Sequence, residues 1–109
     1  TGDFAAAQNS LLAFLRKYPT SGYASSTLFW LGNAQYATKD YKESIVNFRK
    51  LLSIAPQHAR AAEAMLAISN CLVELKDIKA AKKAMEDLVK QYPTSEAAQT
   101  AKDRLARLR

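Results

Sequence analysis

Residues that build catalytic and metal sites are scarce in this sequence. The 109 residues include one histidine and one cysteine, and no cluster of cysteines or carboxylates at metal-ligand spacing surrounds the histidine. Three glycines and three prolines leave little room for long loops, and no glycine-rich phosphate-binding loop is present. No apolar run approaches membrane-spanning length. We therefore expect no enzymatic activity, no cofactor, no bound metal and no insertion into a membrane.

The two scarce reactive residues both have structural explanations. Cys71 lies in the apolar stretch "ISNCLVEL", at a helix-packing position, which predicts a buried and unreactive thiol. His58 lies beside Pro56 at a junction between repeats, where a surface or capping role is expected. Apolar residues make up 49% of the chain, which is enough for one soluble domain of ordinary size.

One short phrase returns twice along the chain, 37 residues further on each time. It reads "GDFAAA" at 2–7, "KDYKES" at 39–44 and "KDIKAA" at 76–81. Laying the three copies over one another without gaps aligns four informative columns: Asp3, Asp40 and Asp77; Leu11, Phe48 and Met85; Pro19, Pro56 and Pro93; and Gly32, Ser69 and Ala106. A repeat of this length indicates a solenoid, in which each unit buries one face against the next.

Each unit is predicted to be a pair of helices. Apolar residues fall at helical spacing in 41–54, and Leu28, Leu31 and Ala34 mark another helix upstream. The proline column ends each second helix. Six helices are expected, near 3–17, 22–38, 41–54, 59–75, 78–91 and 95–108.

Helix caps are predicted from two columns. The aspartate column supplies N-caps for the second helices, and Glu43 is placed to form a capping box with Asp40. Ser21 and Ser95 follow their prolines by two residues and are placed to cap the next first helix. The connection inside each hairpin is therefore a short turn that ends in Lys-Asp.

Small residues in two columns explain how the helices of one hairpin approach each other. These are Gly32, Ser69 and Ala106, and again Ala7, Ser44 and Ala81. Together with the large residues beside them, the sequence resembles the tetratricopeptide (TPR) family at Leu28, Leu31, Gly32, Tyr36, Tyr41, Ser44, Phe48, Leu51 and Pro56. The resemblance implies an all-α fold, a right-handed TPR solenoid of helical hairpins with about six helices.

The chain departs from the family signature in two ways. Gln35 stands where an aromatic residue is expected, and the repeat is about three residues longer than usual. The additional residues lie between each proline and the Gly32 column. We therefore expect the first helix of each hairpin to be nearly one turn longer at its start.

The segments that join the repeats indicate which group of TPR proteins the chain resembles. "YPTS" occurs whole at 18–21 and 92–95, and essentially the whole chain is similar to the C-terminal TPR domain of the Tol-Pal accessory protein family, also called the cell division coordinator CpoB (YbgF). The resemblance implies a periplasmic protein of a Gram-negative bacterium that binds TolA and couples outer-membrane constriction to peptidoglycan synthesis at division. Related outer-membrane lipoproteins use the same junction, so an adaptor in outer-membrane protein assembly is the nearer alternative.

A protein partner is expected on the first helix of each unit, because these helices line the concave side of such a solenoid. Asn33 and Asn70 recur there one repeat apart, and an amide side chain both donates to and accepts from a peptide backbone. The predicted partner-binding residues are Phe29, Trp30, Asn33, Tyr36, Leu66, Asn70, Val73 and Arg107. Trp30 is expected to be partly exposed.

The net charge of +6 raises a nucleic-acid-binding helical solenoid as a second class of function. Lys79, Lys82 and Lys83 stand in the last second helix, but Glu86 and Asp87 are interspersed with the lysines. No stripe of arginines and aromatic residues crosses the repeats, which favours a solvated face and no nucleic acid partner. Attraction to acidic proteins or anionic lipid head groups stays open.

The chain is expected to be a single TPR domain, with a truncated first repeat at 1–21, full repeats at 22–58 and 59–95, and a C-terminal capping helix at 96–109. In that last helix Lys102 occupies the column of Leu28 and Met65, as expected where no further repeat covers a solenoid. The first helix has no hairpin partner in this sequence, so we expect a fragment of a longer precursor. The apolar side of that helix is expected to promote self-association or fraying.

Overall fold

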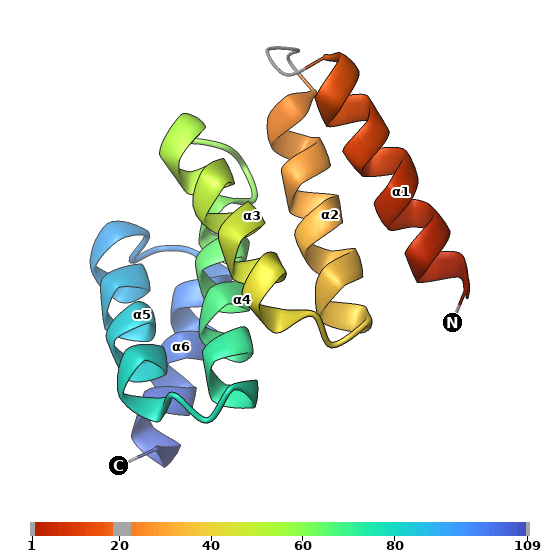
Figure 1. Ribbon diagram of the computed structural model, residues 1–109. Coiled ribbons are helices and arrows are strands. Elements are labelled where there is room, and N and C mark those ends of the chain that lie inside the picture. The colour runs from red at the N-terminus through yellow and green to blue at the C-terminus, as the bar shows by residue number, and fades with distance from the viewer. Residues whose placement is uncertain (1, 19–22, 109) are drawn as a thin grey trace.

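The computed structural model describes residues 2–18 and 23–108, and these form helices joined by short connections (Figure 1). The helices are α1 Gly2–Lys17, α2 Ala24–Ala37, α3 Tyr41–Ile54, α4 Ala61–Glu74, α5 Ile78–Gln91 and α6 Glu96–Arg107. The described residues contain no strand. The all-α, TPR-like helical-repeat fold predicted from the register is confirmed. Over the same residues, no helix combines the length and the apolar character that a membrane span requires.

The helices form two layers. α3 packs between α2 and α4, and α5 packs between α4 and α6. α4 also contacts α2 and α6, whereas no two of α1, α3 and α5 approach each other within the described ranges. The even-numbered helices therefore form an inner layer. The odd-numbered helices form an outer layer, which runs α5, α3, α1 from left to right in Figure 1.

The turns inside the two complete hairpins repeat each other. Lys39 and Lys76 both have φ of 67°, in the left-handed region. At the first turn, the Asp40 amide donates to the carbonyl of Gln35 over 2.8 Å, and the Asp77 amide makes the equivalent bond over 2.9 Å. This arrangement satisfies carbonyls at the end of α2 and α4, as a Schellman motif does. The predicted Lys-Asp turn is confirmed in both copies.

The predicted caps are confirmed at two positions. Asp77 accepts from the Ala80 amide over 3.2 Å, and Ser95 accepts from the Ala98 amide over 3.0 Å. The capping box at Asp40 was wrong, because its side chain makes no cap hydrogen bond, although its backbone angles (−90°, 67°) nearly equal those of Asp77 (−93°, 72°). Asp3 lies within the first turn of α1 instead of preceding it. The predicted cap at Ser21 lies outside the described residues.

The predicted extension of the first helices was wrong for two of the three. α2 and α4 begin two residues later than expected, at Ala24 and Ala61. Before α4, the ring of His58 accepts from the Arg60 amide at Nδ1 over 3.0 Å, which holds the chain in a turn. At the same column before α6, Ser95 caps the helix directly, and α6 begins at once at Glu96. Between these two junctions, the side chain in this column therefore decides whether the additional residues form turn or helix, whereas the residue of this column before α2 lies outside the described residues.

The centre of the fold is the close approach of α2 to α3. A Cβ built on Gly32 would lie 2.7 Å from Cζ of Phe48, a separation that real side chains do not adopt. The hydroxyl of Ser44 donates to the Gly32 carbonyl over 2.7 Å. Ser44, Phe48 and Leu31 are all fully buried. The small-residue column therefore does what the sequence predicted, since the Phe48 ring occupies the space that a side chain at Gly32 would need.

The departure at Gln35 also has a physical explanation. Gln35 is only 5% exposed, and its Oε1 accepts from Nδ2 of Asn47 on α3 over 2.7 Å. The Asn47 amide donates in addition to the Glu43 carbonyl. A buried polar side chain is tolerated when its partners satisfy it, so this pair replaces an aromatic contact with a hydrogen bond between the same two helices.

α1 exposes residues from columns that are buried in the other two copies. Phe48 and Met85 are buried, but Leu11 in the same column is half-buried. Phe4 is 45% exposed as well, in a column that is half-buried or exposed in the other two copies. The reason is that α1 packs against α2 alone among the described helices.

Gly32→Leu is expected to destabilise the fold by roughly 1–3 kcal/mol or more, because the added side chain overlaps the Phe48 ring. Ala37→Leu, at an exposed position of the same helix, serves as the control and should change stability little. Urea unfolding followed by circular dichroism measures both. Equal midpoints for Gly32→Leu and the parent would contradict the assigned hairpin contact.

The exposed side of α1 is expected to promote self-association. Sedimentation velocity over a range of concentrations should show a dimer that weakens when Phe4 and Leu12, both exposed, are replaced by serine. If the chain stays monomeric, amide exchange in α1 should instead be fast, because few contacts protect it. A monomer with a well-protected α1 would contradict this expectation.

Candidate functional site

The inner face of α2, α4 and α6 carries two grooves near opposite ends of α4. The first, here called the Leu66 groove, has a volume of about 370 Å³ and lies between the N-terminal halves of α4 and α6. Its lining residues are Ala59, Ala62, Glu63, Leu66, Ser95, Glu96, Ala97 and Thr100. Small side chains line most of it, and Glu63 and Glu96 are both exposed. This groove is shaped by alanines and edged by carboxylates.

The second groove, here called the Asn70 groove, lies toward the C-terminal ends of the same helices and has a volume of about 220 Å³. It is lined by Tyr36, Asn70, Val73, Glu74, Met85, Arg104 and Leu108. Nη1 of Arg104 donates to Oδ1 of Asn70, which joins α6 to α4 through side chains 34 residues apart. Its walls are largely apolar, with a few polar groups at defined places, which is the character of a binding pocket.

Tyr36 gives the Asn70 groove a rigid aromatic wall. Its ring packs edge-on against Tyr41 at a centroid distance of 5.3 Å. Burial, followed by the negative charge of Glu74, raises the pKa of the Tyr36 hydroxyl above its ordinary value. Tyr36 is therefore a neutral hydroxyl at physiological pH, able to donate and accept hydrogen bonds.

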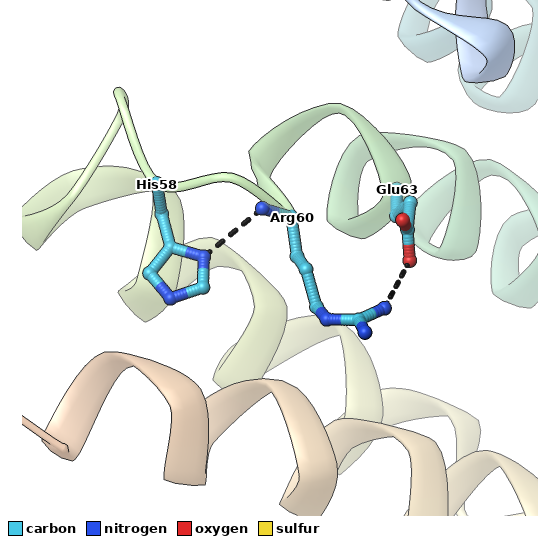
Figure 2. Close-up of polar contacts among 3 residues, drawn as sticks. All are labelled: His58, Arg60 and Glu63. Carbon is cyan, nitrogen blue, oxygen red and sulfur yellow. Dashed lines mark hydrogen bonds and ion pairs between the residues drawn. The ribbon is translucent and has the colours of Figure 1, made fainter.

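Arg60 covers the aromatic pair at the N-terminal end of the inner face. Its guanidinium lies 5.1 Å from the ring centroid of Phe29 and 5.2 Å from that of Trp30, within the range of a cation–π interaction. Figure 2 shows the same side chain directed to Glu63, with Nη1 2.9 Å from Oε2. The two interactions hold the arginine over the rings.

His58 supports this arrangement from the adjoining turn. Because its Nδ1 accepts from the Arg60 amide, the neutral ring carries its proton on Nε2. That nitrogen lies 3.2 Å from Oγ of Ser26 on α2 and donates to it in this tautomer. His58 therefore links the turn before α4 to α2, which agrees with the structural role expected from the sequence.

The structure brings together some of the predicted partner-binding residues. Tyr36, Asn70 and Val73 line the Asn70 groove, and Leu66 lines the other groove. Asn33 is half-buried, and its side chain makes no hydrogen bond to another described residue. Trp30 is 50% exposed, as expected.

Two of the predicted positions differ from the structure. Phe29 is only 4% exposed, because Phe48 packs against one side of its ring at 5.9 Å and Arg60 covers another. Arg107 is exposed and lines neither groove. Arg104, one turn earlier on α6, takes the position at the groove that was predicted for Arg107. Phe29 is therefore buried away from a partner, and Arg107, like Asn33 and Trp30, lines neither groove.

Sequence reasoning missed Arg60, Arg104 and Leu108. Arg104 shares a column with Trp30 and Ala67, so the register placed it on the inner face. The repeat register therefore contains a signal for Arg104, beside the column of Asn33 and Asn70. Arg60 lies outside any helix and no periodicity could find it.

Reactive groups are not gathered at this site. Among residues 2–18 and 23–108, no three His, Cys, Asp or Glu side chains lie close enough to hold a metal ion. Cys71 is a free, fully buried thiol, as predicted. Burial raises the pKa of Cys71, which disfavours the reactive thiolate.

Comparison with known proteins identifies the family. Residues 1–109 match the family model YfiO, which describes an outer membrane lipoprotein. No curated protein matches the chain. The match supports the TPR-like character of the domain and a location in the cell envelope, but it is not a match to the Tol-Pal accessory family. This chain belongs to the YfiO family of outer membrane lipoproteins.

Proposed function

We propose that this chain is a protein-interaction scaffold of the bacterial envelope, which binds a segment of a partner protein on the inner face of α2, α4 and α6. The helical-repeat fold and the family both support a protein-binding role. Solenoids of this kind bind along the surface that their repeats line together. The role is binding without chemistry, since His58 and Cys71 are both engaged in the structure of the fold.

The observation that carries this proposal is the composition of the Asn70 groove. Three successive first helices contribute to it, α2 through Tyr36, α4 through Val73 and α6 through Arg104. An apolar side chain of a partner would displace water from walls that are mostly apolar. The fixed polar groups at the edge would then orient its backbone.

The Asn70 amide has a narrower role than the sequence alone suggests. Its oxygen is occupied by Arg104, and its nitrogen makes no hydrogen bond to another described residue. Asn70 would therefore donate to a partner carbonyl. Asn33, one repeat earlier, is placed to do the same further along α2. The two amides suit a partner segment that crosses from α4 toward α2.

Two finer roles fit a scaffold of this kind. The family description places relatives at the outer membrane, which favours an adaptor in outer-membrane protein assembly. The second candidate is a Tol-Pal accessory role, with a TolA-like partner in the periplasm and a function in cell division, because the "YPTS" junctions and the 37-residue repeat are compatible with both roles. Titration of the purified chain with TolA and with periplasmic segments of the assembly machinery separates the two roles.

The binding face can be mapped directly with a photo-crosslinking residue. Placed at Val73, on the inner face, it should capture a partner protein in living cells. Placed at Val46, a valine of the outer layer that is 43% exposed against 37% for Val73, it should not capture the same protein. Capture at Val46 alone would show that the inner face is not the protein-binding surface.

Asn33→Ala combined with Asn70→Ala is expected to weaken partner binding about tenfold or somewhat more, since each lost hydrogen bond is worth on the order of 0.5–1.5 kcal/mol. Calorimetric titration with the crosslinked partner segment measures this. Asn9→Ala, at an exposed position of α1, is the matched control and should bind normally. Unchanged binding by the double variant would contradict the proposed contacts.

The same titration tests the nucleic-acid alternative. Replacing Lys79, Lys82 and Lys83 by glutamine should leave partner binding intact, because these residues lie on α5 in the outer layer. The nucleic-acid alternative would be favoured if the chain bound single-stranded RNA strongly at low salt, and if the lysine variant lost this binding while the asparagine variant kept it.

A further inference from the structure

Charge is divided unevenly between the two layers of the fold. The outer helices α1, α3 and α5 together carry nine Lys or Arg residues and four Asp or Glu residues, a net charge of +5. The inner helices α2, α4 and α6 carry three and four, a net charge of −1. Most of the chain's net charge of +6 is therefore on the face that the protein-binding grooves do not use.

α3 is the central helix of this outer face and carries its most distinctive stripe. At helical spacing along its exposed side stand Lys42, Val46, Arg49, Lys50 and Ile54. Val46 is 43% exposed and Ile54 is 59% exposed. Among the described residues, Lys42, Arg49 and Lys50 take part in no ion pair. The stripe thus alternates free cations with exposed aliphatic side chains.

The lysines of α5 attract anions less strongly than the cations of α3, because carboxylates lie beside them. Lys83 is paired with Asp87 at 2.9 Å, and Glu86 stands beside them. On α3, by contrast, Glu43 is the one carboxylate. The attraction of the outer face for anions is therefore centred on α3.

Furrows with apolar floors run on both sides of α3. One, of about 290 Å³, is bounded by Leu15, Lys50 and Ile54 above buried Leu28. The other, of about 190 Å³, lies between Arg49 of α3 and Asp87 of α5, which is paired with Lys83, and reaches Met65 and Ile68 of α4. Each furrow therefore combines a cation at its rim with aliphatic carbon below.

We propose that this outer face docks on the anionic phospholipid head groups of a membrane, with α3 as the central contact. Cations and exposed aliphatic residues on one face are what binding at a lipid interface requires, and each Lys or Arg near an anionic surface adds to the attraction. A bilayer fits better than an acidic protein for two reasons. Besides the central cations of α3, the outer face carries further Lys or Arg residues on α1 and α5, and the family is one of outer membrane lipoproteins. Docking in this orientation leaves the inner grooves open to a partner.

The test uses two variants of equal net charge. Arg49→Gln with Lys50→Gln, and Lys102→Gln with Arg107→Gln, each lower the net charge from +6 to +4. Binding to phosphatidylcholine vesicles with and without phosphatidylglycerol is measured by co-sedimentation at low salt. The α3 variant is expected to lose about 30-fold in partitioning, which corresponds to about 1 kcal/mol for each cation. The α6 variant should lose much less.

A third variant, Val46→Ser with Ile54→Ser, keeps every charge and should reduce the part of the binding that persists at high salt. Circular dichroism checks that all three variants fold. The proposal is overturned if phosphatidylglycerol does not increase the binding of the parent chain to vesicles, or if the two charge variants lose vesicle binding to the same extent. Displacement from vesicles by poly-glutamate at matched charge concentration would show that the face prefers an acidic protein.

Discussion

The close contact between Gly32 and Phe48 is the constraint on which the rest of the structure depends. Because no side chain separates the α2 backbone from the Phe48 ring, the two helices lie near enough for Ser44 to donate to the Gly32 carbonyl. Ser44 in turn lies 3.5 Å from Sγ of Cys71 on α4. The separation of α2 and α4, and hence the position of their inner side chains, follows from this chain of contacts.

The alignment of the repeats predicted the helix bounds that depend only on residues close by in the sequence. The bounds of α3 and α5 equal the expected ranges, because the aspartate and proline columns terminate them locally. The start of α4 was missed, since the His58 side chain turns the backbone there, whereas Ser95 in the same column caps α6 directly. A cap depends on the side chain at one position, so it cannot be predicted from the features that all copies of the repeat share.

Sequence periodicity does not describe the candidate site where side chains reach across helices. Periodicity gives the angle of a residue around its own helix, which was enough for Tyr36, Asn70 and Val73. It cannot show that Arg60 extends over the Phe29 ring, nor that Arg104 reaches Asn70. Long arginines lie far from the Cα position that a column describes. The departure at Gln35 was visible in the sequence, but its partner Asn47 required the structure.

α6 has a role beyond the capping role that its polar columns suggest. It supplies Arg104 to the Asn70 groove. A partner side chain in that groove would exclude water from the Asn70–Arg104 hydrogen bond and so strengthen it electrostatically. Affinity on the inner face should therefore depend on how firmly α6 packs against α4 and α5. The short alanine side chains Ala97 and Ala101, buried in that contact, would then influence binding without touching the partner.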